Sequence, residues 1–202
     1  MGRPKMLLPW NDTTILGFLI NRWQQLGAKP VAVVHAAGAR AIEVELDRIG
    51  LTADHRIVNP APEQGMFGSI QCAAHGERWD KAVTHFVFVL GDQPHLRSAT
   101  LATLLDFAKH NPDQICQPRH GDKPRHPVVL PKKYFLELSR ATEKTLQQFL
   151  EARAAARSLC PIADPGLDLD LDRPEDYERA RHLTAVEKID KSNGPGQPSP
   201  CP

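Results

Sequence analysis

The chain has 202 residues, of which 41% are hydrophobic and 24% are charged. This ordinary globular composition excludes a fibrous or wholly disordered protein, and one domain accommodates the length. A formal net charge of +1 gives no general attraction to nucleic acid or to a membrane surface. The sequence has neither a membrane-spanning apolar run nor a secretion signal, so we expect a cytoplasmic protein with no nucleic-acid and no membrane partner. The four cysteines include no CxxC pair, so neither a zinc site nor a disulfide framework is predicted.

Helices and strands alternate through the first half of the chain. Apolar residues spaced by three and four predict a helix over residues 13–26, with Asp12 or Thr13 as its cap and Gly27 as its end. Further predictions are a strand over 30–35, a helix over 39–50, a strand over 55–59 and a helix over 65–76. This alternation is typical of an α/β protein with a largely parallel sheet.

The second half continues the alternation. The apolar run over residues 85–94 predicts a strand that is buried on both faces and stops at Gly91 and Asp92. Later predictions are a helix over 98–110, strands over 114–118 and 126–130, a helix over 142–155, a strand over 158–163, and a turn, short strand and helix over 164–183. Beyond residue 183, Pro, Gly and Ser become frequent. We therefore expect one domain over 1–183 and a disordered tail over 184–202.

Two acidic segments are candidate metal ligands. Asp92 follows the apolar strand in "GDQP", at the edge where α/β sheets bind ligands, and a carboxylate there suits Mg²⁺. The segment "LDLDLD", taken as a strand, would place Asp168, Asp170 and Asp172 on one face, with Asp172 at its end. The alternatives are an aspartate that caps the next turn and an exposed acidic edge strand.

Three further segments carry groups that suit an anionic ligand. In "NPAPEQGMFGSI", Asn59 ends a strand, and Gly65 and Ser69 lie at a helix start whose free N–H groups suit an anion. The remaining candidates are Arg3 and Lys5 in the opening turn and a basic group formed by Arg119, His120, Lys123, Arg125 and His126. The alternatives are a connecting loop, a surface terminus and a solvated hairpin. A cradle for a phosphorylated substrate is the functional interpretation.

In this order, the segments resemble the MobA-like nucleotidyltransferases, and within them the molybdenum cofactor cytidylyltransferases. "MGRPKMLLP" is similar to the end of the family's LAAGxSxRMGxxK loop, "NPAPEQGMFGSI" to its NP…GM.SSI segment, and "VLGDQPHL" to its GDQP motif. "HPVVL" is similar to its GHPV.F segment and "DLDLDRPEDY" to its DIDTPEDY ending. The resemblance implies a Rossmann-like three-layer α/β/α fold. It also implies transfer of CMP from CTP to the terminal phosphate of molybdopterin cofactor, with release of pyrophosphate.

The resemblance also implies roles for individual residues. It makes Lys5 and Asp92 catalytic, with Lys5 neutralising the triphosphate and Asp92 and Asp172 holding Mg²⁺. The implied nucleotide-binding residues are Arg3, Lys5, Asn59, Gly65 and Ser69, and the implied acceptor-binding residues are Arg125 and His126. These roles agree with the chemistry of nucleotidyl transfer, which needs mainly charge neutralisation and alignment.

The sequence departs from the family pattern at two places. Arg125 stands where the family has glycine before HPV, and neither the LAAGxSxR stretch nor the central first strand precedes Met1 in this chain. We expect the missing strand to leave two interior strands unpaired, at roughly 1–3 kcal/mol for each buried orphaned group. The alternatives to CMP transfer are use of GTP, another acceptor, or a catalytically silent paralogue that binds the cofactor or a molybdoenzyme partner.

Overall fold

The structure is a computed structural model that describes residues 4–75 and 79–192. The α-helices in this part of the chain are α1 (Ile15–Gln25), α2 (Arg40–Arg48), α3 (Gly65–Ala74), α4 (Ser98–His110), α5 (Lys132–Leu138), α6 (Leu146–Glu151) and α7 (Pro174–Ser192). The strands are β1 (Pro9–Trp10), β2 (Thr13–Thr14), β3 (Val33–Ala36), β4 (Arg56–Asn59), β5 (His85–Phe88), β6 (Ile115–His120), β7 (Lys123–Pro124), β8 (Val128–Pro131) and β9 (Arg157–Pro161). Single turns of 3₁₀-helix are η1 (Lys5–Leu7), η2 (Ala53–His55), η3 (Pro62–Gln64), η4 (Ala154–Ala156) and η5 (Pro165–Asp168).

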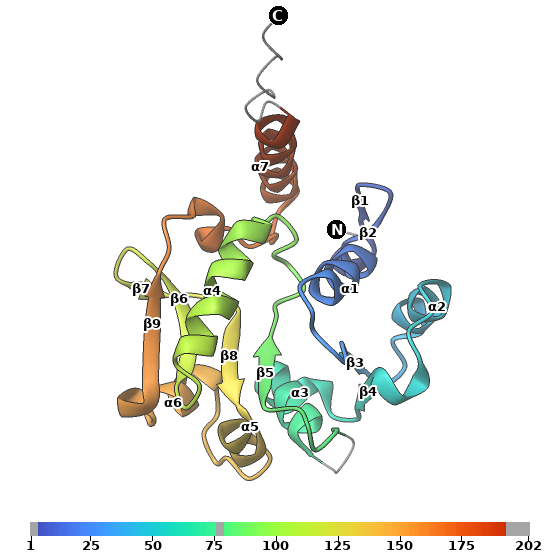
Figure 1. Cartoon of the computed structure of the whole chain (residues 1–202). Helices are drawn as coiled ribbons and strands as arrows, with labels where there is room; N and C mark the ends of the chain where they lie inside the picture. The colour runs from blue at the N-terminus through green and yellow to red at the C-terminus, as the bar shows by residue number, and fades with distance from the viewer. Residues whose placement is uncertain (1–3, 76–78, 193–202) are drawn as a thin grey trace, which may run out of the picture.

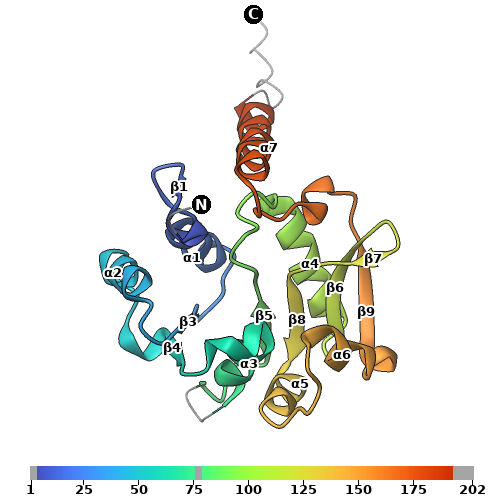
Figure 2. The same cartoon turned by 180° about the vertical axis from the view of Figure 1, so that it is seen from behind.

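Helices cover both faces of the strands, as Figures 1 and 2 show from opposite sides. On one face, Trp23 of α1 and Leu101 of α4 share an apolar cluster. On the other face, α3, α5 and α6 contribute Phe67, Phe135 and Phe149 to a second cluster. These three layers confirm the expected α/β/α sandwich.

Besides the small antiparallel pair β1–β2, the described strands form a mostly parallel arrangement in two separately paired parts. β3 and β4 pair in parallel, as do β6 and β9. β8 is antiparallel to both β5 and β6, so β5, β6 and β9 run in one direction and β8 in the other. Among the described strands, β3 pairs only with β4 and β5 only with β8, and their other edges face each other (Figure 1). The expectation of two incompletely paired interior strands is therefore confirmed.

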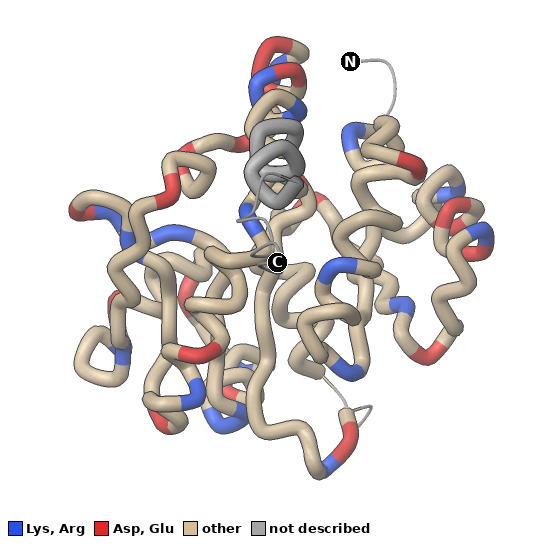
Figure 3. The backbone as a smooth tube through the Cα atoms, turned by 45° about the horizontal axis from the view of Figure 1, so that its top comes forward, with Lys and Arg blue, Asp and Glu red and all other residues tan. Residues whose placement is uncertain are grey.

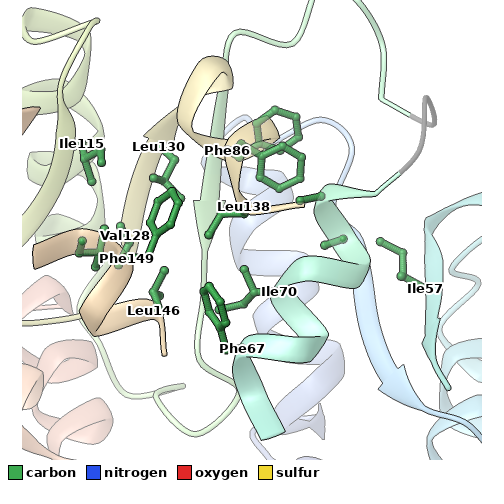
Figure 4. Packing of buried hydrophobic residues seen from close by; sticks show 14 residues of the cluster. Ile57, Phe67, Ile70, Phe86, Ile115, Val128, Leu130, Leu138, Leu146 and Phe149 are labelled. Carbon is green, nitrogen blue, oxygen red and sulfur yellow. The ribbon is translucent and has the colours of Figure 1, made fainter. Parts of the chain in front are cut away.

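The largest apolar cluster lies between the second helical layer and the sheet, and Figure 4 shows its packing. Phe135 of α5 is 1% exposed and stacks on Phe86 of β5, with ring centroids 3.6 Å apart and planes 6° from parallel. Trp79 meets the edges of both rings. The apolar residues predicted for β5 and β8 therefore meet those of α3 and α5 in one core.

Several element boundaries differ from the sequence predictions. Helix α1 is capped by Thr14, whose hydroxyl accepts from the Gly17 N–H, instead of by Asp12 or Thr13. β5 ends at Phe88, before Gly91, and Phe86 is buried while its other three residues are only half-buried. Helix α5 was not predicted, because Pro131 and two lysines interrupt the apolar pattern where it begins. Helix α6 is also shorter than expected.

The acidic segment near the C-terminus does not form the predicted strand. Residues 165–168 form the 3₁₀ turn η5, and the chain runs without regular structure to Arg173. The predicted alternation still exists, because Leu167, Leu169 and Leu171 are all buried. Helix α7 begins with an acidic first turn, as predicted, but continues to Ser192, past the expected domain end at residue 183. Residues 193–202 of the predicted tail lie outside the described residues.

Basic and acidic positions are interspersed over the described chain, as Figure 3 shows. The first two turns of helix α7, for example, carry both signs, with Glu175, Asp176 and Glu178 near Arg179 and Arg181. No helix among the described residues is long and apolar enough to cross a membrane.

Candidate active site

Lys5 is held close to the GDQP segment by packing of its own 3₁₀ turn. Lys5 begins η1, and the next residue, Met6, lies directly over Gly91. A Cβ atom at Gly91 would lie 2.4 Å from Met6 Sδ, so a larger residue would force the flexible Met6 side chain to move. Glycine at position 91, directly before Asp92, thus leaves room for the Met6 side chain.

The ammonium group of Lys5 lies between two carboxylates from distant parts of the chain. Lys5 Nζ donates to Asp92 Oδ2 and to Asp172 Oδ1, both at 3.1 Å. Partial burial lowers the pKa of Lys5, but the hydrogen bonds and charges of Asp172 and Asp92 outweigh it and raise the pKa above its ordinary value. The amine is therefore charged at neutral pH. Lys5, Asp92 and Asp172, which belong to the first, middle and last of the sequence motifs, meet at one point.

Asp172 is positioned because its segment is tied to the GDQP segment. The backbone N–H of Leu171 donates to the Asp92 carbonyl at 3.3 Å. The buried side chain of Gln93 donates through Nε2 to Asp170 Oδ1 at 2.9 Å. His95, three residues after Asp92, places its Nε2 2.9 Å from the Gly166 carbonyl oxygen, so this nitrogen carries the proton. These contacts hold residues 166–172 alongside residues 92–95.

A buried carboxylate anchors the start of the same segment. Asp164 accepts hydrogen bonds from the Thr100 hydroxyl and, at 3.0 Å, from the Gly166 N–H, and it lies 3.2 Å from Arg97 Nε. Burial raises the pKa of Asp164, but the hydrogen bonds from Thr100, Arg97 and Gly166 outweigh it and hold the pKa below its ordinary value. The charged carboxylate thus fixes η5 against the start of α4.

Asp92 and Asp172 bring two carboxylates together, which is the ligand type that a divalent cation such as Mg²⁺ takes. The two carboxylate oxygens are no more than twice 3.1 Å apart, because both contact the same nitrogen. Asp92 Oδ1 is buried and has no hydrogen-bond partner among the described residues, so Oδ2 is the Asp92 oxygen that faces Lys5. Within the same residues, no three His, Cys, Asp or Glu side chains gather to hold a metal by themselves. A cation here would complete its shell with phosphate and water oxygens, as Mg²⁺ usually does.

The predicted acceptor-binding residues, Arg125 and His126, lie near the same acidic segment. Burial lowers the pKa of His126, against the opposing charges of Asp170 and Asp92. Its Nδ1 is buried with no partner in the described part of the chain. Arg125 Nε and His120 Nδ1 both lie 2.6 Å from Asp168, the residue that ends η5. These two contacts hold the basic hairpin against the acidic segment, and the Arg125 guanidinium is paired with Asp168.

Asn59 and Ser69 are brought together at the start of α3. Asn59 is buried, and its Nδ2 donates to Ser69 Oγ at 3.0 Å while its Oδ1 accepts from the Ala61 N–H at 2.9 Å. Gly65, the first residue of α3, has φ of 78°, a conformation that favours glycine. These bonds position the amino end of α3. Arg3, the remaining predicted nucleotide-binding residue, lies outside the described residues.

The comparisons with known proteins agree with this geometry. A family model, the MobA-like NTP transferase domain, matches residues 1–158. The chain belongs to this family. It is therefore a nucleotidyltransferase, as the resemblance of its motifs implied.

Individual relatives are similar over most of this MobA-like transferase. It is 25% identical to molybdenum cofactor cytidylyltransferase of Escherichia coli (strain K12) over 182 residues, which cover 90% of this chain and 88% of that protein. The crystal structure of Rv0371c from Mycobacterium tuberculosis H37Rv has a TM-score of 0.68 and 27% identity, covering 90% of each chain. A structure of Rv0371c in complex with manganese has a TM-score of 0.64 and 26% identity, covering 90% of this chain and 93% of that one.

Sequence reasoning missed two supporting residues of the MobA-like transferase and misplaced three others. Gln93 and His95 follow Asp92 directly, but nothing in the sequence indicated that they bind the acidic segment. The prediction that Asp168, Asp170 and Asp172 share one strand face was wrong. Without a strand there, each takes a different partner: Arg125 with His120, Gln93, and Lys5, respectively.

Proposed function

We propose that the protein transfers CMP from CTP to the terminal phosphate of molybdopterin cofactor and releases pyrophosphate. The observation that carries the proposal is the meeting of Lys5, Asp92 and Asp172, which joins a cationic group to a pair of carboxylates beyond the end of β5. The similarity to the cytidylyltransferase of E. coli supports CTP as nucleotide and molybdopterin cofactor as acceptor.

The reaction needs little covalent participation from the protein. An oxygen of the acceptor phosphate attacks the α-phosphorus of CTP, and a new P–O bond forms as the bond from the α-phosphorus to the bridging oxygen breaks. Pyrophosphate leaves with that electron pair. A Mg²⁺ ion between Asp92 and Asp172 would supply positive charge to the phosphate oxygens. Lys5 neutralises charge on the triphosphate, and the amino end of α3, fixed by Asn59 and Ser69, borders the nucleotide.

The acceptor side follows from the position of the hairpin. His126 lies close enough to Asp92 and Asp170 for their charges to act on it, so it is the hairpin residue nearest to the proposed metal site. Arg125 stands where the family has glycine, and its guanidinium is held against Asp168. We assign both residues to binding of the phosphorylated acceptor, with Arg125 as the residue that distinguishes this chain from the family pattern.

The test is pyrophosphate release from the full chain with Mg²⁺, molybdopterin cofactor and either CTP or GTP. The E. coli relative serves as the positive control and Asp92→Asn as the negative control. We expect turnover with CTP that the Asp92→Asn variant lacks. Turnover with GTP but not with CTP would show that GTP is the nucleotide substrate. A folded chain that CTP and Mg²⁺ stabilise against heat, but that releases no pyrophosphate, would contradict catalysis and favour a silent binding protein.

A further inference from the structure

We propose that Lys5 has a second role in the free protein: its ammonium group occupies the place of the divalent cation and leaves it when the triphosphate arrives. Metal and nucleotide would then bind cooperatively, and the metal alone would bind weakly. This inference rests on the proposed function, because it concerns the same two carboxylates.

The geometry places the ammonium where the metal belongs. Lys5 Nζ is equidistant, at 3.1 Å, from one oxygen of Asp92 and one of Asp172. A Mg²⁺ ion bound by the same two oxygens would lie about 2.0–2.1 Å from each, in the space that the ammonium fills. The two cations also repel each other at such a distance. Lys5 must therefore withdraw before the metal can bind both carboxylates.

The side chain of Lys5 can move while its backbone stays in place. The η1 turn is fixed by Met6 against Gly91 and by the Leu7 N–H, which donates to the Pro4 carbonyl at 2.9 Å. The lysine side chain itself is 36% exposed and ends a flexible stem, so it has room to turn outward. Asp172 is 72% exposed and offers an open approach for the incoming metal. The exchange is thus a local movement of one side chain.

The triphosphate offers new hydrogen-bond acceptors to the Lys5 ammonium group when it leaves the two carboxylates. Without nucleotide, the metal must break two charge-assisted hydrogen bonds of Lys5 and leave the ammonium without a partner. With CTP bound, phosphate oxygens accept the same protons and also complete the metal's coordination shell. By thermodynamic linkage, metal and CTP must each raise the affinity of the other by the same factor, typically about 5- to 150-fold. Removing the lysine charge should abolish most of this coupling.

The experiment is a titration with Mn²⁺ at neutral pH, in which free Mn²⁺ is measured by electron paramagnetic resonance with and without CTP. The variants are Lys5→Met, which removes the charge, and Lys5→Arg, which keeps it. The controls are Asp92→Asn and Lys109→Met, which removes an exposed lysine charge on α4, away from the site. Without CTP, we expect Lys5→Met to bind Mn²⁺ at least about fivefold more tightly than the native chain. Lys5→Arg and Lys109→Met should resemble the native chain.

The outcomes separate this inference from the proposed function. Equal or weaker Mn²⁺ binding by Lys5→Met, or a native affinity that CTP does not change, would overturn the exchange. The CTP dependence of the native chain tests it even if the variants fold poorly. If CMP transfer is observed together with independent binding, the function stands and the inference falls. If neither the native chain nor Lys5→Met binds Mn²⁺ better than Asp92→Asn, even with CTP, both fall.

Discussion

Replacement of Gln93 by leucine tests how the two acidic segments are held together. The Gln93 side chain is 5% exposed, and leucine of similar size would fill its place. The change removes the 2.9 Å hydrogen bond from Nε2 to Asp170 Oδ1. This bond is one of the ties that keep Asp172 near Asp92, so its loss should loosen the metal site without emptying the core.

The size of the effect follows from the environment of the bond. A hydrogen bond to a charged group contributes about 1.5–3 kcal/mol, and the lower end applies because Asp170 is exposed and water can replace the amide. About 1.4 kcal/mol corresponds to a tenfold change in an equilibrium constant. Loss of a group that orients a metal ligand typically costs about 10- to 100-fold in affinity or activity. We therefore expect about a tenfold loss in Mn²⁺ affinity for Gln93→Leu.

The assay is Mn²⁺ binding in the presence of CTP, with thermal unfolding as the check on folding. Asp170→Asn is the matched control, because asparagine keeps the oxygen that accepts from Gln93 and should change affinity by less than about threefold. Asp172→Asn should lose much more than Gln93→Leu. If Asp170→Asn lost as much as Asp172→Asn, or if Gln93→Leu bound like the native chain, the assignment of Asp170 as a support and Asp172 as a ligand would be refuted.

Two further predictions concern stability. Asp164→Asn should lower the free energy of unfolding by about 1–3 kcal/mol at neutral pH. Because the folded-state pKa of Asp164 lies below its unfolded value of about 3.9, this difference is present above about pH 4 and is lost as the pH falls further. Urea denaturation of the native chain and the variant at neutral pH and below about pH 4 checks this prediction. A stability difference that grows in acid would contradict it. Phe135→Ala should lower the free energy of unfolding by about 3–5 kcal/mol. Its neighbour Leu136 is 45% exposed, so Leu136→Ala should lower it by about 0.5 kcal/mol or less in the same assay. Equal losses would contradict the placement of Phe135 in the core.

The sequence predicted the layers because periodicity reports burial directly. The run that forms β5 and the three-and-four spacing in α1 depend on local pattern, and both elements exist where the pattern indicated. The same logic explains the errors. In the acidic segment the leucines are buried as the alternation required, but none of the described strands pairs with it, and residues 165–168 form η5 instead. Alternation thus predicts which side chains face inward. Whether the segment forms a strand depends on backbone pairing with residues that are distant in the sequence.

The candidate site was only partly visible in the sequence. Lys5, Asp92 and Asp172 were chosen from their motifs, and the structure brings all three together. The contacts between Gln93 and Asp170 and between Arg125 and Asp168 join residues separated by 77 and 43 positions. Local pattern carries no information about such pairs, because they exist only once the fold has placed the two segments side by side. The pairing of Asn59 with Ser69 was hidden for the same reason.

The most direct test of the central claim follows the nucleotide itself. The chain is incubated with Mg²⁺, molybdopterin cofactor and CTP labelled at its α-phosphate with radioactive phosphorus, and the products are separated by chromatography. We predict that label appears in the acceptor, in equal amount to the pyrophosphate released, and that Asp92→Asn and Asp172→Asn form little of it. The account would be contradicted if the E. coli relative labelled the acceptor under these conditions while the folded native chain did not, or if both aspartate variants transferred label at the native rate.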